Sequence, residues 1–194
     1  MTTRRTFMKR AALATAAVSG GQLTFGNGKP LDHSSPVKGE EDELFFKISL
    51  AQWSLNQVIR GGDLDNLDFP SYTKTKFDIH AVEYVDQFFP SADTNYIREL
   101  LKRTEDIDVK NVLIMIDTAG SLADQNEEKR IKSVEDHYKW VEAAEILGCH
   151  AIRVNARGNG SELDVAHSAT KSLTTLSQFA ADYGISVIVE NHGG

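Results

Sequence analysis

Residues 187–194 read Val-Ile-Val-Glu-Asn-His-Gly-Gly and follow Ile185, so an almost continuous apolar run ends in a carboxylate. Such a run predicts a parallel strand that is buried on both faces. A glutamate at the end of a buried strand needs a partner, because an unpaired charge is costly to remove from water. In parallel α/β folds, ligands bind at the carboxyl ends of the strands. Glu190 is therefore expected to lie in an active site.

The composition is typical of one soluble globular domain. The chain has 194 residues, of which 41% are hydrophobic and 25% charged, and its formal net charge is -7. The first 30 residues contain five basic side chains and no acidic one, so the remainder is more acidic than the whole. An acidic body argues against nucleic acid as the main partner. The single cysteine, Cys149, excludes an intramolecular disulfide and is expected to be a packed core thiol.

The N-terminus has the pattern of an export signal. Residues 3–9, Thr-Arg-Arg-Thr-Phe-Met-Lys, resemble the bacterial twin-arginine signal family, whose pathway carries already folded proteins. The apolar stretch 11–18 is too short and too weakly hydrophobic for a permanent membrane span. A basic disordered tail is the alternative. We expect a signal peptide over 1–25, a polar linker over 26–44 and an exported, periplasmic body over 45–194.

From residue 45 onward, segments with strand and helix patterns alternate. The strands recur about every 30–40 residues, which is the length of a βα unit. Gly148 and Gly184 follow two of the helical stretches, as expected for C-terminal caps. The predicted strands are 47–53, 79–85, 109–116, 151–155 and 185–190, and the predicted helices are 64–77, 93–104, 127–147 and 162–183.

Five consecutive βα units are compatible with two α/β architectures, the first part of a (β/α)8 barrel and an open doubly wound sheet. The nucleotide-binding form of the open sheet carries Gly-x-Gly-x-x-Gly after a strand, and no predicted strand is followed by that motif. The Gly-Asn-Gly sequence at 158–160 is too weak a match to count.

Polar side chains gather at the carboxyl ends of the predicted strands, where a barrel holds its active site. Trp53 is expected in the core, with a substrate platform as the alternative. Asp117 is expected to cap a loop or helix. Arg153 either pairs with a carboxylate inside the barrel or contacts substrate. Asn155 and Arg157 are either ordinary loop residues or substrate contacts.

Two glutamates are harder to explain by structure alone. Glu83 lies inside an apolar run and Glu190 directly follows one, so both need partners and are expected to be functional. His192 is two residues beyond Glu190 and would share its face if the strand continues. The remaining histidines have structural interpretations: His80 and His150 begin strands, and His137 and His167 are expected to be solvated on helices.

The order and spacing of four segments resemble the xylose isomerase-like TIM barrel superfamily, in particular its sugar phosphate isomerase/epimerase group. Inosose dehydratases, ketose 3-epimerases and hydroxypyruvate isomerases are relatives. The resemblance covers about residues 45–194 and implies the first five βα units of a TIM barrel. The segments that carry it are 48–54, 81–85, 148–155 and 187–194.

The resemblance implies that Glu190 is the first of four ligands to a divalent metal (Mn2+, Mg2+, Co2+ or Zn2+) and one carboxylate of an acid/base pair. The metal would polarise a sugar carbonyl while a carboxylate moves the neighbouring proton through an enediolate. The other three ligands come from strands six to eight, so we expect an N-terminal fragment that binds metal weakly and catalyses little. The expected substrate contacts are Glu83, His192, Trp53, Asn155 and Arg157.

Three functions are therefore weighed. The first is an exported, metal-dependent isomerase or epimerase of a small sugar, sugar phosphate or polyol, with a lyase or dehydratase as a variant. The second is a non-catalytic carbohydrate-binding or structural module in which two partial barrels form a homo-oligomer that covers the exposed strand edges. The third is an endonuclease-type phosphodiesterase of the same superfamily, against which the export signal and the acidic body weigh.

Overall fold

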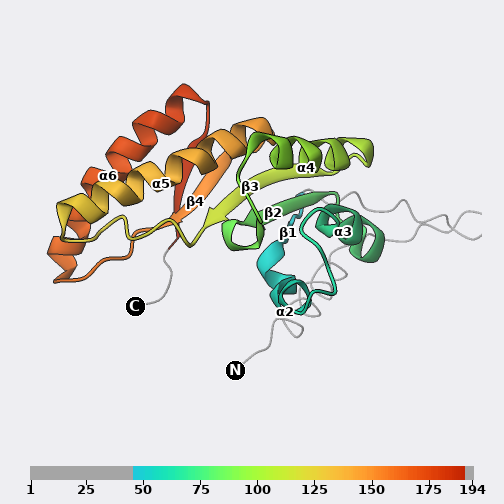
Figure 1. Cartoon of the computed structure of the whole chain (residues 1–194), viewed down its shortest axis with the longest axis horizontal. Helices are drawn as coiled ribbons and strands as arrows, with labels where there is room; N and C mark the ends of the chain where they lie inside the picture. Colours follow the sequence, from blue (N-terminus) through green and yellow to red (C-terminus); the bar gives the residue numbers. More distant parts are fainter. Residues whose placement is uncertain (1–45, 191–194) are drawn as a thin grey trace, which may run out of the picture. The chain divides into compact units, whose positions relative to one another are not determined.

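The structure, a computed structural model, describes residues 46–190, which form five parallel strands alternating with helices (Figure 1). The expected signal peptide (1–25), the expected linker (26–44) and His192 lie outside the described residues. The strands are β1 (Leu50–Ala51), β2 (Ala81–Val85), β3 (Lys110–Ile116), β4 (Ala151–Asn155) and β5 (Ser186–Glu190). The helices are η1 (Gln52–Leu55), α2 (Asn56–Arg60), α3 (Phe69–Phe77), η2 (Asp86–Phe88), α4 (Thr94–Asp106), α5 (Glu127–Ile146) and α6 (Glu162–Asp182).

The strand order β1-β2-β3-β4-β5 follows the sequence, and each neighbouring pair is parallel. This is the order of consecutive βα units in a barrel, whereas a doubly wound sheet reverses its order near the middle. The expected partial barrel is therefore confirmed.

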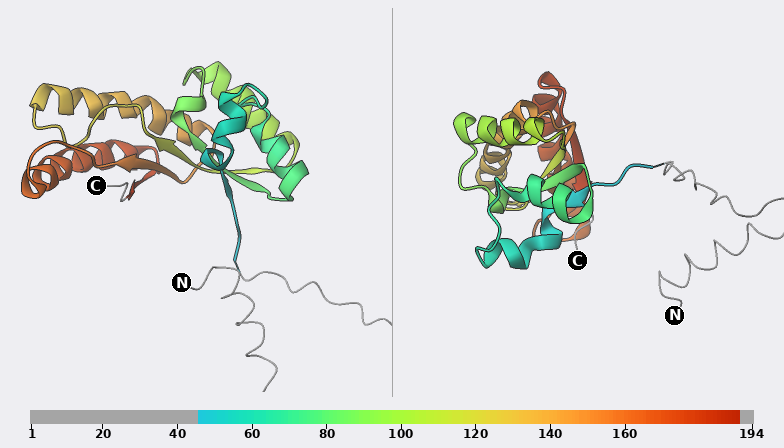
Figure 2. Two further views of the ribbon diagram at one scale, coloured as in Figure 1. Left: turned by 90° about the horizontal axis from the view of Figure 1, so that it is seen from below. Right: turned by 90° about the vertical axis from the view of Figure 1, so that its right-hand side faces the viewer.

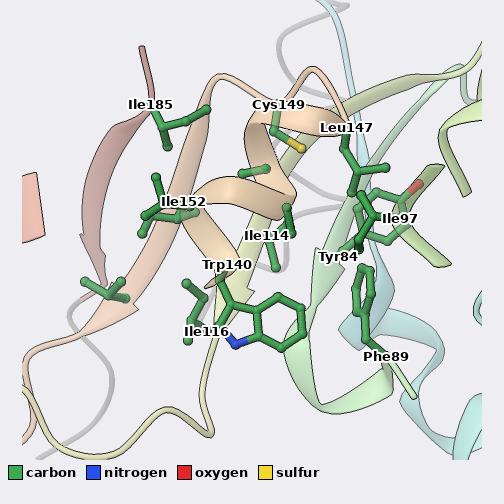
Figure 3. Close-up of a cluster of buried hydrophobic side chains, with 14 of the residues drawn as sticks. Tyr84, Phe89, Ile97, Ile114, Ile116, Trp140, Leu147, Cys149, Ile152 and Ile185 are labelled. Atoms are coloured by element: carbon green, nitrogen blue, oxygen red, sulfur yellow. The ribbon is translucent and has the colours of Figure 1, made fainter. Parts of the chain in front are cut away.

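Strand alternation gives the sheet one apolar face. Alternate residues of β2 to β4 are almost fully buried beneath the helices: Val82, Tyr84, Ile114, Ile116, Ile152 and Val154. Helices α4, α5 and α6 run along this face (Figures 1 and 2), and a cluster of buried side chains that includes Phe89 fills the space between them and the sheet (Figure 3). The Phe89 ring meets Tyr84 and Trp140 edge-on at centroid distances of 5.6 and 5.4 Å. The residues in between therefore face the opposite side, where the barrel interior lies.

The first strand is shorter than the predicted 47–53, because the chain leaves the sheet at Gln52. The Gln52 side chain is fully buried, accepts a hydrogen bond from the Val85 backbone N–H at 2.9 Å and donates to Asn66 at 2.5 Å. These bonds fix the backbone in the single turn of η1, which continues into α2. Neither short helix has the hydrophobic period that sequence reasoning detects.

The fifth strand is less buried than its apolar sequence predicted. Ile188 and Val189 are 42% and 46% exposed. In residues 46–190, β5 pairs only with β4, so one of its sides has no neighbouring strand. An edge strand cannot be covered as a central strand is, and the expectation of burial on both faces was wrong for the described part of the chain.

The helix ends agree with the sequence. Gly148 and Gly184 follow α5 and α6 with φ of 70° and 69°, a conformation that residues with a Cβ rarely adopt. Cys149, the next residue after the first of these caps, is buried as expected, and burial raises the pKa of its thiol to about 12. This thiol is therefore a packing group and not a nucleophile at neutral pH.

His137 was expected to be solvated and is instead 2% exposed. The buried residues of α5 include Ser133, Val134, Trp140 and Val141 as well as His137, so His137 lies on the face that the helix turns toward the core. The His137 Nδ1 lies 2.7 Å from the Ser133 carbonyl oxygen. Burial lowers the pKa of His137, because a charged imidazole would be removed from water.

This burial predicts a pH dependence of stability. The folded-state pKa of His137 lies below the ordinary value of 6.5, so its contribution to folding is complete above that pH. The contribution falls as the pH drops from 6.5 toward the lowered folded-state pKa. We expect the free energy of unfolding, measured with urea, to fall less between pH 7 and 5 in His137→Gln than in the wild type. His167→Gln, which changes an exposed histidine, should retain the wild-type decline. Parallel curves for the wild type and His137→Gln would contradict this interpretation.

Candidate functional site

A cavity of about 610 Å³ opens at the carboxyl ends of the strands. It is the place where parallel α/β barrels bind their ligands. Four of the residues expected to be functional line it, namely Trp53, Glu83, Arg157 and Glu190. The complete lining is Ala51, Trp53, Ser54, Glu83, Val85, Gln87, Met115, Asp117, Arg153, Arg157 and Glu190.

Arg153 connects two carboxylates in the wall of this cavity. One terminal nitrogen of its guanidinium lies 3.2 Å from Asp117 Oδ1, and the other pairs with Glu190 Oε2. Only 15% of the Arg153 side chain is exposed, and a charge removed from water to this degree needs such partners. Asn155 donates to the same Asp117 oxygen at 2.7 Å. The network therefore joins β3, β4 and β5 at their carboxyl ends.

Two buried atoms of this network lack a hydrogen-bond partner among the described residues. They are the Nε of Arg153 and the Oδ1 of Asn155; a third buried atom, Glu190 Oε2, has no partner other than its ion pair with Arg153. Most buried polar atoms in native proteins are bonded, and the exceptions often mark places where a water, an ion or a ligand binds. The network thus holds one free donor and one free acceptor beside the cavity. Asn155 itself does not line the cavity; its contribution there is to hold Asp117.

Asp86 fixes the backbone at Asp117 and Thr118 by hydrogen bonds. Asp86 is 2% exposed and follows β2. Its carboxylate accepts hydrogen bonds from the backbone N–H groups of Asp117 and Thr118, both at 3.0 Å, and from the Thr118 hydroxyl at 2.5 Å. A carboxylate that satisfies three donors holds the end of β3 against the end of β2. The backbone position of Asp117 is therefore held by Asp86.

Glu83 faces the cavity from the middle of β2 and is half-buried. The hydroxyl of Ser49 donates to its Oε1. The register between β2 and β3 shifts between Val82 and Glu83, an irregularity that changes where a side chain points. The expected partner of Glu83 is thus a neutral hydroxyl from the segment before β1. This leaves its carboxylate free to accept further hydrogen bonds from a ligand.

Trp53 was expected in the core but lies at the rim of the cavity, 47% exposed. The chain has already left the sheet at this residue, so its indole cannot point beneath the helices. It stacks on Phe88 with ring centroids 6.2 Å apart, and the Arg60 guanidinium lies 5.5 Å from each ring centroid. Arg60 also donates to Gln87. An exposed aromatic face held in this way suits contact with the C–H face of a sugar.

Arg157 lies in the loop after β4 and is exposed at the cavity. Its carbonyl oxygen accepts hydrogen bonds from Ala123 N at 3.0 Å and from the Ser121 hydroxyl at 2.5 Å, which tie this loop to the loop after β3. A Cβ at Gly158 would lie 2.1 Å from the Ala123 carbonyl oxygen, so this close approach requires glycine. The side chain of Arg157 forms no ion pair within residues 46–190.

Sequence reasoning missed two members of the site: Asp117 was expected to be a cap, and Asp86 was not singled out. Arg153 was expected either to pair with a carboxylate or to contact substrate, and it pairs with two carboxylates. The alternation of side chains along β4 was an available signal. Arg153 and Asn155 are two residues apart and therefore lie on the same face of the strand. The contacts of Asp86 with residues 117 and 118 join positions that are far apart in the sequence, and no local pattern reveals them.

The described side chains do not form a complete divalent metal site. In residues 46–190 no three Asp, Glu, His or Cys side chains come together in a way that would hold an ion. Glu190 offers the oxygen donors that such metals prefer, but its carboxylate is paired with Arg153. Glu190 thus fits as one ligand at most, and His192, which was expected to contact substrate, lies outside the described residues.

Fold and site together define an α/β protein with the first five βα units of a parallel barrel and a polar cavity at the carboxyl ends of its strands. The chain belongs to the xylose isomerase-like TIM barrel family, whose model matches residues 75–194, more than half of the chain. The family expected from the sequence is thus confirmed. A search of curated protein sequences found no match. No helix within residues 46–190 combines the length and apolarity needed to cross a membrane.

Three solved structures illustrate the likeness. A D-tagatose 3-epimerase-like protein is 18% identical, with a TM-score of 0.61 over 77% of this chain and 54% of that chain. The 3-keto-D-glucoside 4-epimerase of E. coli is 20% identical, with a TM-score of 0.53 over 63% and 49%. The IolI protein with a bound zinc atom is 14% identical, with a TM-score of 0.58 over 74% and 51%. The chain spans about half the length of these structures, and at such identities the likeness shows the fold alone.

The support of Asp117 by Asp86 can be tested by a change that conserves volume. Asp86→Asn places an amide NH2 group where backbone N–H groups now donate, which leaves a buried donor without an acceptor. We expect the free energy of unfolding to fall by about 1–3 kcal/mol. Glu135→Gln removes one charge in the same way on an exposed position of α5 and should change it by less than about 0.5 kcal/mol. Urea unfolding of the full chain measures both, and equal effects would contradict the role given to Asp86.

Proposed function

We propose that this barrel acts on small sugars or polyols as an isomerase or epimerase. The observation that carries the proposal is the convergence of Glu83, Glu190 and Trp53 on one cavity at the carboxyl ends of the strands. The family and the epimerases among its structural neighbours support the same class. A lyase or dehydratase that removes a proton beside a carbonyl would use the same groups.

The proposed chemistry is a proton transfer between adjacent carbons of the sugar. Glu190 removes the proton beside the carbonyl, giving an enediolate, and a carboxylate returns the proton to the neighbouring carbon or to the opposite face. Glu83 and Arg157 bind sugar hydroxyls, as a free acceptor and a free donor. Trp53 packs against the C–H face of the ring. Asn155 holds Asp117 in the wall, and His192 is proposed as a further substrate contact.

We extend the proposal to a divalent metal, Mn2+, Mg2+, Co2+ or Zn2+, with Glu190 as one of its ligands. The bound zinc atom of the IolI structure supports it, as does the oxygen chemistry of the carboxylate. When bound, such an ion would stabilise negative charge on the sugar oxygens. The described residues supply no second ligand.

Deuterium exchange tests the proton transfer directly. The full chain is incubated in D2O with a panel of ketohexoses and MnCl2, and exchange of the C–H beside the carbonyl is followed by proton NMR. We expect exchange above the protein-free blank, lowered by roughly 100-fold or more in Glu190→Gln, because the amide cannot accept the proton. Glu128→Gln, an exposed position in the first turn of α5, is the control and should match the wild type.

The second candidate is a non-catalytic carbohydrate-binding module. Two observations favour it: Trp53 is exposed at the rim of the cavity, and Glu190 in the same cavity is already paired with Arg153. In this case a sugar would change the fluorescence of the Trp53 indole while no deuterium enters the sugar. Trp140 is buried in the core, so Trp140→Phe isolates the signal of Trp53. Absence of both exchange and binding with every sugar would reject both candidates.

We infer from residues 3–9 that the protein is exported to the periplasm through the twin-arginine pathway. The support is the match of the sequence and the lack of acidic residues before Leu31. These residues lie outside the described part of the chain.

A reporter fusion tests the export signal. Residues 1–44 are fused to a fluorescent protein and expressed in a bacterium with an intact twin-arginine pathway. We expect the reporter in the periplasmic fraction, and we expect it to remain in the cytoplasm when Arg4→Lys and Arg5→Lys are combined. Lys9→Arg outside the arginine pair is the charge-matched control. Cytoplasmic fluorescence from the unaltered fusion would overturn the assignment.

A further inference from the structure

Gln87 is half-buried in the wall of the cavity, in the short helix η2 that follows β2. The preceding residue, Asp86, is buried and accepts a hydrogen bond from the backbone N–H of Asp117 at 3.0 Å. The backbone N–H of Val85 donates to the buried Gln52 side chain at 2.9 Å. The main chain before Gln87 is therefore held in place, and only its side-chain amide is left to be oriented.

Arg60 determines the orientation of the Gln87 amide. The Arg60 guanidinium donates to Gln87 Oε1. A guanidinium carries only donors, so it can bond to the oxygen of an amide but not to its NH2 group. The flipped amide would place donors against donors, so this assignment of oxygen and nitrogen follows from the chemistry of the two groups. Within residues 46–190 no group accepts from the Gln87 NH2, which is free to donate to a ligand in the cavity.

Two aromatic rings hold Arg60 in place. Its Cζ lies 5.5 Å from the ring centroids of both Trp53 and Phe88, and the two centroids are 6.2 Å apart. The faces of such rings attract a guanidinium. The three centres form a nearly equilateral triangle, so Phe88 and Arg60 approach the indole from the same side. Two groups on opposite faces of the indole would lie much farther from each other.

The other side of the Trp53 indole is therefore available to a ligand. Trp53 is 47% exposed and lines the cavity together with Gln87. An apolar surface and a hydrogen-bond donor thus lie in one wall, and a single guanidinium contacts both side chains. A sugar has C–H groups on its faces and oxygen atoms at its edges, which is the complement of this pair.

We propose that Gln87 is a substrate-binding residue whose NH2 group donates to an oxygen of the sugar that packs on Trp53, and that Arg60 is the positioning residue for both side chains. The inference rests on the proposed sugar substrate, and it does not depend on proton transfer or on a metal. Its consequence is that a residue outside the cavity lining orients two of the contacts within it.

Sugar affinity of the full chain tests the contact. The chain with Trp140→Phe is the reference, because Trp53 is then its only tryptophan and reports binding of D-tagatose, D-psicose or D-fructose by fluorescence. We expect Gln87→Glu to weaken the tightest of these complexes at least about fivefold, because glutamate still accepts from Arg60 but lacks the NH2 group. Gln178→Glu, the same change on an exposed position of α6, should stay within about twofold.

Nitrogen–proton correlation NMR observes the donor itself. The side-chain NH2 signals of Gln87 are those that disappear in Gln87→Glu. We expect them to shift as sugar is added to the reference protein and to follow the same binding curve as the fluorescence. Gln87→Met, which adds no charge, should weaken binding as Gln87→Glu does, and it decides the question if circular dichroism shows that Gln87→Glu is unfolded. Signals that stay in place while the sugar binds would overturn the role of Gln87.

The role of Arg60 has its own readout. Arg60→Met removes the guanidinium and keeps the apolar stem, so we expect the sugar affinity to fall about threefold or more and the fluorescence anisotropy of Trp53 to decrease. Arg60→Lys retains a cation and a donor and should partly restore both quantities. Arg98→Met, an exposed arginine of α4, is the control and should match the reference. Unchanged affinity and anisotropy in Arg60→Met would contradict its positioning role.

The outcomes separate this inference from the proposed function. Sugar binding that is equally tight in Gln87→Glu and Gln87→Met overturns the inference and leaves the proposed function standing. Absence of binding with every sugar overturns both. Binding that depends on Gln87, without deuterium exchange, supports the inference and rejects the isomerase.

Discussion

The alternation of side chains along parallel strands is the constraint on which the rest of this structure depends. Every second residue of β2, β3 and β4 is committed to the core beneath the helices, as Val82, Ile114 and Ile152 show. The residues between them must then occupy the opposite face, whether polar or not. Arg153 and Glu83 lie on that face because their neighbours are apolar. The core thus determines where the chemistry is placed.

Much of the fold was predictable because its signals are local. The period of each helix, the apolar strands and the glycine caps are visible within a few residues, and β4 was located at 151–155 as observed. The errors have tertiary causes. Gln52 ends β1 by bonding to residues 66 and 85, and β5 is exposed because of its position in the sheet. His137 is buried because the face of α5 that carries it packs against the core.

The location of the candidate site was predictable from the sequence, but the contacts between its side chains were less so. An unusual carboxylate after an apolar run identified Glu83 and Glu190, and both line the cavity. The partner of Glu190 was not predictable, because Arg153 comes from the neighbouring strand β4. A strand ends in a polar residue for many reasons. The register places Asn155 opposite Glu190, and only the side-chain contacts of the folded structure show that Arg153 is the residue that pairs with Glu190. Trp53 lies after the first strand as expected, but its side chain is exposed where burial was expected.

The close contact at Gly158 has a consequence for access to the cavity. The backbone of this residue touches Ala123, and Ala123 also donates to the carbonyl of Arg157. The loops after β3 and β4 are thereby joined into one continuous wall. The Arg157 side chain, which lines the cavity on this side, is therefore carried by two loops that cannot move independently of each other, whereas the side chains of Trp53 and Ser54 reach the cavity from the segment after β1.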